Sequence, residues 1–86
     1  MQYYVYILQS EVTFKYYCGQ TNSIEFRLLR HNNKEVKSTV HGVPWKMIGY
    51  IICDSRSESM RLEKEIKKRG INRWLNSNPN RLIKEW

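Results

Sequence analysis

Arginine and histidine occur together in one helix-forming stretch of the sequence, where their spacing could direct both side chains at one ligand. Arg27 and His31 are four residues apart, so on a helix they would point in the same direction. A guanidinium can bind two oxygens of a phosphate, and a neighbouring imidazole can donate or relay a proton. The alternative is that both side chains face solvent, opposite a stripe formed by Ile24 and Leu28. Taken alone, the pair favours the solvent-facing alternative.

Two tyrosines and a glutamate are the other candidates for chemistry. Tyr6 and Tyr17 lie in strand-forming segments and could meet across a hairpin, where nearby positive charge would ease deprotonation of a phenol. Glu63 lies beside the apolar stripe of a later helix, and Mg²⁺ typically binds one or two such carboxylates together with water. The ordinary alternatives are cross-strand aromatic packing for the tyrosines and an ion pair with Lys67 for Glu63. Each residue taken alone favours its ordinary role.

The elements that must position these residues follow from hydrophobic periodicity and turn residues. Alternating Tyr, Val and Ile predict strands over residues 3–10 and 15–20, which together form a hairpin. A helix follows the N-cap residues at 21–23 and runs to about residue 31, and a basic loop over 33–43 leads to a strand over 45–53. A capping box at Ser55 and Glu58 then begins a helix that ends at Gly70. The chain continues with a short segment over 71–76 and a last apolar patch of Leu82, Ile83 and Trp86. The nearly unbroken apolar run over 45–53 predicts a strand covered on both faces. We therefore expect an α+β fold, with a small three-stranded antiparallel sheet flanked by helices in the order strand, strand, helix, loop, strand, helix, helix.

Length and charge restrict the class of protein. The 86 residues predict one domain, and 15 Lys and Arg against 8 Asp and Glu give a net charge of +7, which favours a polyanionic partner such as nucleic acid or an acidic membrane. Only two cysteines are present, without a paired CxxC motif, so a zinc site is not expected. No stretch approaches the roughly 20 apolar residues that span a bilayer, and the first residues do not resemble a secretion signal. We expect a cytoplasmic protein with reduced thiols and no membrane partner.

Several short motifs, in order, resemble those of the GIY-YIG nuclease family. They are Tyr4-Val5-Tyr6, Tyr17-Cys18-Gly19, Arg27 followed by His31-Asn32, the segment KSTVHGVPW at 37–45, and the segment RLEKEIKK at 61–68. The resemblance extends from about Tyr3 to Ile83 and is greatest to small stand-alone bacterial members similar to the nuclease domain of the UvrC excision-repair subunit. It implies that residues 1–86 form a single GIY-YIG-like nuclease domain.

The family resemblance implies a DNA endonuclease, acting in DNA repair or processing, that uses one Mg²⁺ or Mn²⁺ per site. Tyr17 would activate water or act as general base, and Arg27 would steady the scissile phosphate. Glu63 would hold the metal, and Tyr6 and His31 would orient the nucleophile or relay protons. In-line attack on a phosphodiester needs these functions: an activated water, charge neutralisation and a stabilised leaving oxygen.

The resemblance also implies supporting roles around the site. Gly19 would leave room for close packing, and Asn32, Lys37 and Asn76 would serve structure or substrate binding. The family often places an asparagine near the C-terminal end of the site; Asn76 is taken for it here, and Asn78 and Asn80 are the alternatives. Gln20 stands where some members have a lysine after the glycine.

Three functional interpretations stay open on the sequence. The first is an active endonuclease, and the second is a nucleic-acid-binding module of the same fold that cleaves weakly or needs a protein partner for substrate specificity. A chain of this size has no separate DNA-reading domain, so phosphate contacts would dominate and binding would weaken steeply with salt. The third is RNA binding through exposed Tyr3 or Tyr4 on the sheet, although the aromatic signature of such proteins is absent.

Overall fold

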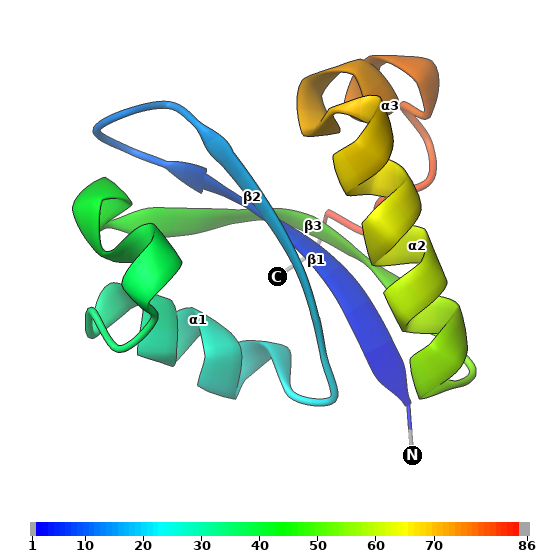
Figure 1. Ribbon diagram of the computed structural model, residues 1–86, viewed down its shortest axis with the longest axis horizontal. Coiled ribbons are helices and arrows are strands. Elements are labelled where there is room, and N and C mark those ends of the chain that lie inside the picture. Colours follow the sequence, from blue (N-terminus) through cyan, green and yellow to red (C-terminus); the bar gives the residue numbers. More distant parts are fainter. Residues whose placement is uncertain (1, 85–86) are drawn as a thin grey trace.

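The computed structural model of the protein describes residues 2–84, and its elements follow the predicted order (Figure 1). Along the chain they are strand β1 (Tyr3–Ser10), strand β2 (Tyr16–Thr21), helix α1 (Ile24–Asn32), 3₁₀-helix η1 (Lys37–Gly42), strand β3 (Trp45–Cys53), helix α2 (Arg56–Arg69) and helix α3 (Ile71–Ser77). The α+β class and the three-stranded sheet are confirmed.

The strands form one antiparallel sheet in the order β2-β1-β3. In the hairpin, Tyr6 pairs with Gly19 and Leu8 pairs with Tyr17. The central strand is β1, whose residues Val5 to Leu8 are at most 1% exposed. The prediction that the strand over 45–53 is covered on both faces is confirmed in part. Residues of β3 pack in both core clusters, Cys53 in one and Trp45 in the other, but Ile52 is 42% exposed.

The sheet separates two helical layers. Helix α1 and η1 lie on one side of the sheet, and α2 and α3 lie on the other (Figure 1). Side chains alternate along β1, so Val5 and Ile7 pack with Ile66 and Trp74, whereas Tyr6 and Leu8 belong to the opposite cluster. The two edge strands are β2 and β3, and β2 is the one that lies next to the catalytic candidates.

Local signals set the ends of the helices. Ser55 is the N-cap of α2, and its side chain accepts a hydrogen bond from the Glu58 amide at 3.1 Å. The Glu58 carboxylate accepts from the Asp54 amide, which completes a variant of the capping box. The helix stops at Gly70, whose φ of 95° is favourable only for glycine. Such local devices explain why α2 was predictable to within a residue or two.

The C-terminal segment partly covers the outer edge of β3. The backbone of Tyr50 exchanges two hydrogen bonds with Ile83, of 3.1 and 2.8 Å. A Cβ on Gly49 would lie 2.9 Å from Leu82 Cβ, so the absent side chain permits this close packing. The predicted apolar patch therefore serves the edge of the sheet, and its third member, Trp86, lies outside the described residues. Within residues 2–84, no helix is long and apolar enough to cross a membrane.

Candidate active site

A buried chain of hydrogen bonds joins β1, α1 and η1 at the centre of the candidate site. The Tyr6 hydroxyl oxygen lies 3.0 Å from His31 Nε2, and His31 Nδ1 lies 2.7 Å from Thr39 Oγ1. Each of these three side chains is 1% exposed. The alternative that places His31 in solvent is therefore wrong, and the rings of Tyr6 and His31 are held firmly in place.

The contacts of Thr39 define which atoms carry the protons. The Thr39 hydroxyl donates its single hydrogen to the Val36 carbonyl oxygen at 3.2 Å, so its oxygen accepts from His31 Nδ1–H. Nε2 is then the unprotonated nitrogen of His31, and the Tyr6 hydroxyl donates to it. The two hydrogen bonds fix the orientation of the Tyr6 hydroxyl and of the His31 ring.

The electrostatic surroundings keep both members of this pair neutral. Burial, reinforced by the positive charges of Arg27 and Arg30, lowers the pKa of His31 from 6.5 to about 4. Burial, with a further contribution from Tyr17, raises the pKa of the Tyr6 phenol above its ordinary value, although Arg27 acts in the opposite direction. Tyr6 therefore keeps its proton at neutral pH, while His31 presents a free lone pair to it.

Arg27 lies on α1 one turn before His31, and its side chain is half-buried. Its effects on the pKa values of Tyr6 and His31 reflect its place beside the pair. Among residues 2–84, no side chain forms an ion pair or hydrogen bond with the Arg27 guanidinium. A guanidinium beside a buried neutral pair, without a carboxylate partner, is suited to bind an anion.

Tyr17 lies on the same face of the hairpin as Tyr6. The two rings are 6.3 Å apart between centroids, and the Tyr17 ring is 4.9 Å from that of His31. No described residue hydrogen-bonds the Tyr17 hydroxyl, in contrast to that of Tyr6. Gly19 makes room for Tyr6, because a Cβ there would lie 2.5 Å from its hydroxyl oxygen.

Glu63 and Lys67 belong to α2 and approach β2 from the face of the sheet opposite α1 (Figure 1). They form a helical ion pair, with Lys67 Nζ 2.6 Å from Glu63 Oε2. Lys67 Nζ also lies 5.6 Å from the centroid of the Tyr17 ring. Burial would lower the pKa of Lys67, but the hydrogen bond and charge of Glu63 outweigh that effect and raise it. Lys67 thus brings a permanent positive charge to Tyr17, although the residue after Gly19 is the uncharged Gln20.

The supporting residues are distributed unevenly. Asn32 is structural, because its side chain accepts from the Trp45 amide at 2.7 Å and donates to the Trp45 carbonyl at 3.1 Å. Lys37 is exposed at the start of η1, and Asn76 is exposed near the end of α3. No hydrogen bond or ion pair in residues 2–84 connects Lys37 or Asn76 with the Tyr6–His31 pair.

The donor set is consistent with one weakly held hard cation. The described residues contain no group of three or more His, Cys, Asp or Glu side chains that could hold a metal. Glu63 is half-buried at the rim of a groove of about 600 Å³, which can admit water and a phosphate beside the carboxylate. Mg²⁺ commonly keeps several waters and uses one or two carboxylates with substrate phosphates, so a single glutamate fits such an ion and does not fit zinc.

Sequence reasoning missed the roles of Thr39 and Lys67 and the burial of His31. The signal for His31 was present, because it follows Ile24 by seven residues and Leu28 by three, so it shares their face of α1. Lys67 had been considered only as a partner of Glu63. No local pattern reveals that Thr39, in an irregular segment, meets a helical histidine.

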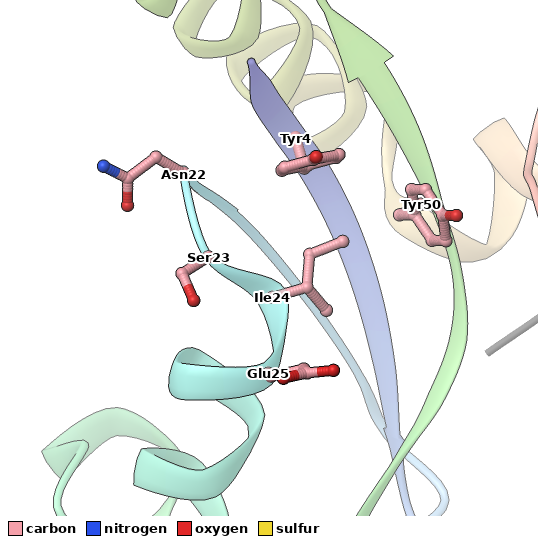
Figure 2. Close-up of a pocket in the computed structure, with 6 residues that line it drawn as sticks. All are labelled: Tyr4, Asn22, Ser23, Ile24, Glu25 and Tyr50. Atoms are coloured by element: carbon pink, nitrogen blue, oxygen red, sulfur yellow. The ribbon is translucent and has the colours of Figure 1, made fainter. Parts of the chain in front are cut away.

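A separate pocket opens beside the N-terminal end of α1, with a volume of about 250 Å³. It is lined by Tyr4, Asn22, Ser23, Ile24, Glu25 and Tyr50. Figure 2 shows Tyr4 and Tyr50 on neighbouring strands with Ile24 directed toward them, whereas the Asn22 side chain points away. Tyr4 packs edge-on against Tyr50, and Glu25 brings negative charge. None of the predicted site residues lines this pocket, and its carboxylate is unfavourable for a phosphate.

The fold and the site together define a class of small nuclease-like domains. Residues 2–76 match the model of the GIY-YIG catalytic domain, and the chain belongs to this family. It is 37% identical over 87 residues to UPF0213 protein YsiG of Lactococcus lactis subsp. lactis (strain IL1403), covering 98% of this chain and 82% of that protein. The solution NMR structure of UPF0213 protein BH0048 from Bacillus halodurans is similar, with a TM-score of 0.57 and 26% identity over 94% of this chain and 87% of that one. Membership of the family suggests nuclease activity and a nucleic-acid substrate.

Proposed function

We propose that the protein is a divalent-metal-dependent endonuclease that hydrolyses DNA phosphodiester bonds. The observation that carries the proposal is the presence of five suitable groups around the β2 edge. The sheet and α1 contribute a buried Tyr6–His31 hydrogen bond, a phenol whose hydroxyl has no partner among the described residues, and a guanidinium that is likewise unpaired within residues 2–84. A carboxylate and a lysine come from α2. An ordinary packed core does not require this combination.

The two tyrosines would have different tasks. The Tyr17 hydroxyl would bind the attacking water and activate it or act as its general base, with Lys67 Nζ 5.6 Å from the centroid of its ring. Tyr6 would accept a hydrogen bond from the same water and keep it oriented, because its own proton is donated to His31. The water oxygen would form the new bond to phosphorus as the ester P–O bond breaks.

Charge neutralisation would be divided between the two helices. The Arg27 guanidinium would hold nonbridging oxygens of the scissile phosphate from the α1 side. Glu63 would hold one Mg²⁺ or Mn²⁺ from the α2 side, where the ion's chemistry is to stabilise the developing and leaving oxygen charge. Lys64 and Lys68 line the same groove as Glu63, so neighbouring phosphates would have cations to bind.

A second candidate function is nucleic-acid binding with little cleavage. It is favoured by the 2.6 Å ion pair that engages Glu63 and by the absence, among the described residues, of any group of three or more His, Cys, Asp or Glu side chains that could hold a metal. Binding would then depend on phosphate contacts alone and would fall steeply with rising salt.

The experiment that separates these functions is a cleavage assay on labelled single-stranded, duplex, nicked and branched DNAs. It would use Mg²⁺ or Mn²⁺ with a chelator control. Tyr17→Phe and Glu63→Gln would be compared with Tyr16→Phe on the adjacent strand position and Glu65→Gln on the exposed side of α2. We expect metal-dependent cutting to fall at least about 100-fold in the first two variants and to persist in the two controls.

Two other outcomes would change the conclusion. Salt-sensitive binding without cutting by the wild type would favour the binding module. Cutting that survives both Tyr17→Phe and Glu63→Gln would contradict the assigned site.

A further inference from the structure

Lys67 contacts two of the candidate residues, Glu63 on its own helix and Tyr17 on β2. Its Nζ lies 2.6 Å from Glu63 Oε2 and 5.6 Å from the centroid of the Tyr17 ring, so the ammonium group lies between the candidate residue of α2 and that of β2. Its side chain is 47% exposed, whereas that of Glu63 is 22% exposed. The ammonium end is therefore free to move while the carboxylate is more restricted.

The ion pair conflicts with metal binding in its present form. The Lys67 ammonium and a divalent cation would compete for the same oxygen, Glu63 Oε2. If both stayed beside that oxygen, two like charges would lie within a few ångströms of each other, which is unfavourable even at the protein surface. A metal ion bound at Glu63 Oε2 would therefore displace Lys67.

The surroundings offer Lys67 a second place. Its flexible four-carbon stem carries a compact charge with three donors, and the Tyr17 hydroxyl has no other partner among the described residues. The groove beside it is already basic, since Lys64 and Lys68 also line it. An arriving phosphate would therefore be the anion that best receives a displaced lysine at this position.

We infer that Lys67 is an active-site residue that exchanges partners. In the free protein it is the counterion of Glu63, and when a divalent cation binds Glu63 it turns to the Tyr17 hydroxyl and a substrate phosphate. This inference rests on the proposed function, because it requires Glu63 to hold the metal. Its consequence is mutual reinforcement: nucleic acid draws Lys67 away and strengthens metal binding, and metal strengthens nucleic-acid binding by the same factor.

Metal binding without catalysis provides the direct test. Mn²⁺ affinity would be measured by calorimetry for the whole protein, alone and with an oligonucleotide whose phosphorothioate backbone resists cutting. Lys67→Met and the charge-preserving Lys67→Arg would be compared with Lys46→Met, which removes an exposed lysine of β3 that does not line the groove.

We expect Lys67→Met to bind Mn²⁺ about two- to fivefold more tightly than the wild type without oligonucleotide, the range expected for loss of one ion pair. The oligonucleotide should strengthen Mn²⁺ binding by the wild type and Lys67→Arg, and much less by Lys67→Met. At saturating metal, cleavage by Lys67→Met should fall at least about tenfold, because the charge beside Tyr17 is missing. Lys46→Met should keep the wild-type Mn²⁺ affinity and coupling.

Failures of the two ideas are distinguishable. Equal Mn²⁺ affinity and equal coupling in Lys67→Met and the wild type would overturn the exchange of partners while leaving the nuclease proposal intact. Equal Mn²⁺ affinity in Glu63→Gln and the wild type would overturn both, because Glu63 would not be the metal ligand.

Discussion

The buried His31 of α1 should make the free energy of unfolding depend on pH in the acid range. His31 is 1% exposed and has a pKa of about 4 in the folded protein, against 6.5 in an unfolded chain. Between these values the unfolded state binds a proton that the folded state does not, so stability falls as pH falls through this window. From pH 7 to pH 5 this one group should remove roughly 2 kcal/mol from the free energy of unfolding.

The assay is urea denaturation at pH 7 and pH 5, with the midpoint and the slope fitted together. The wild type would be compared with His31→Gln, which removes the titrating ring, and with His41→Gln, which removes the exposed histidine of η1. We expect His31→Gln to be less stable at pH 7, because Tyr6 and Thr39 lose hydrogen-bond partners, by about 1–3 kcal/mol. Between pH 7 and pH 5, the free energy of unfolding of His31→Gln should fall by about 2 kcal/mol less than that of the wild type or of His41→Gln.

An equal loss on acidification in His31→Gln and the wild type would refute the reasoning. If His31→Gln does not fold, an NMR titration of the wild-type imidazole resonances decides the question. His31 should then remain unprotonated down to about pH 4.

Two further substitutions test the packing that supports the site. Gly19→Ala would place a Cβ 2.5 Å from the hydroxyl oxygen and 2.6 Å from Cζ of the buried Tyr6. The substitution should therefore lower the free energy of unfolding by about 1–3 kcal/mol in urea denaturation. Unchanged stability would contradict this close approach. Asn32→Ala removes both hydrogen bonds to the Trp45 backbone and should cost about 1–3 kcal/mol, whereas the exposed neighbour Asn33→Ala should change the unfolding midpoint little.

The sequence predicted the elements well because their signals are local. The alternation in β1 placed Tyr6 and Leu8 on one face and Val5 and Ile7 on the other, as the packing clusters confirm. The cap at Ser55 and the glycine at position 70 likewise act within one turn of the chain. Signals of this range do not depend on which strands become neighbours.

The position of a strand in the sheet was harder to predict. The apolar run of β3 predicts a strand covered on both faces, and the structure confirms this in part, because Ile52 is 42% exposed. The run in β3 has two separate causes: its residues pack in both core clusters, and its outer edge receives Leu82 and Ile83 from the C-terminal segment. Periodicity reports that apolar surface is covered, but it does not report whether a strand, a helix or a loop covers it.

The candidate site depends on this same unpredicted feature, the strand order. Tyr17 points to the α1 face of the sheet, whereas Glu63 and Lys67 belong to α2 on the other face. The two groups meet only because β2 is an edge strand, around which the Lys67 side chain reaches to 5.6 Å from the Tyr17 ring. Were β2 the central strand, the sheet and a further strand would separate the phenol from the carboxylate. Motif spacing along the sequence can therefore suggest the residues, but it is the β2-β1-β3 order that brings Lys67 beside Tyr17 at one edge of the sheet.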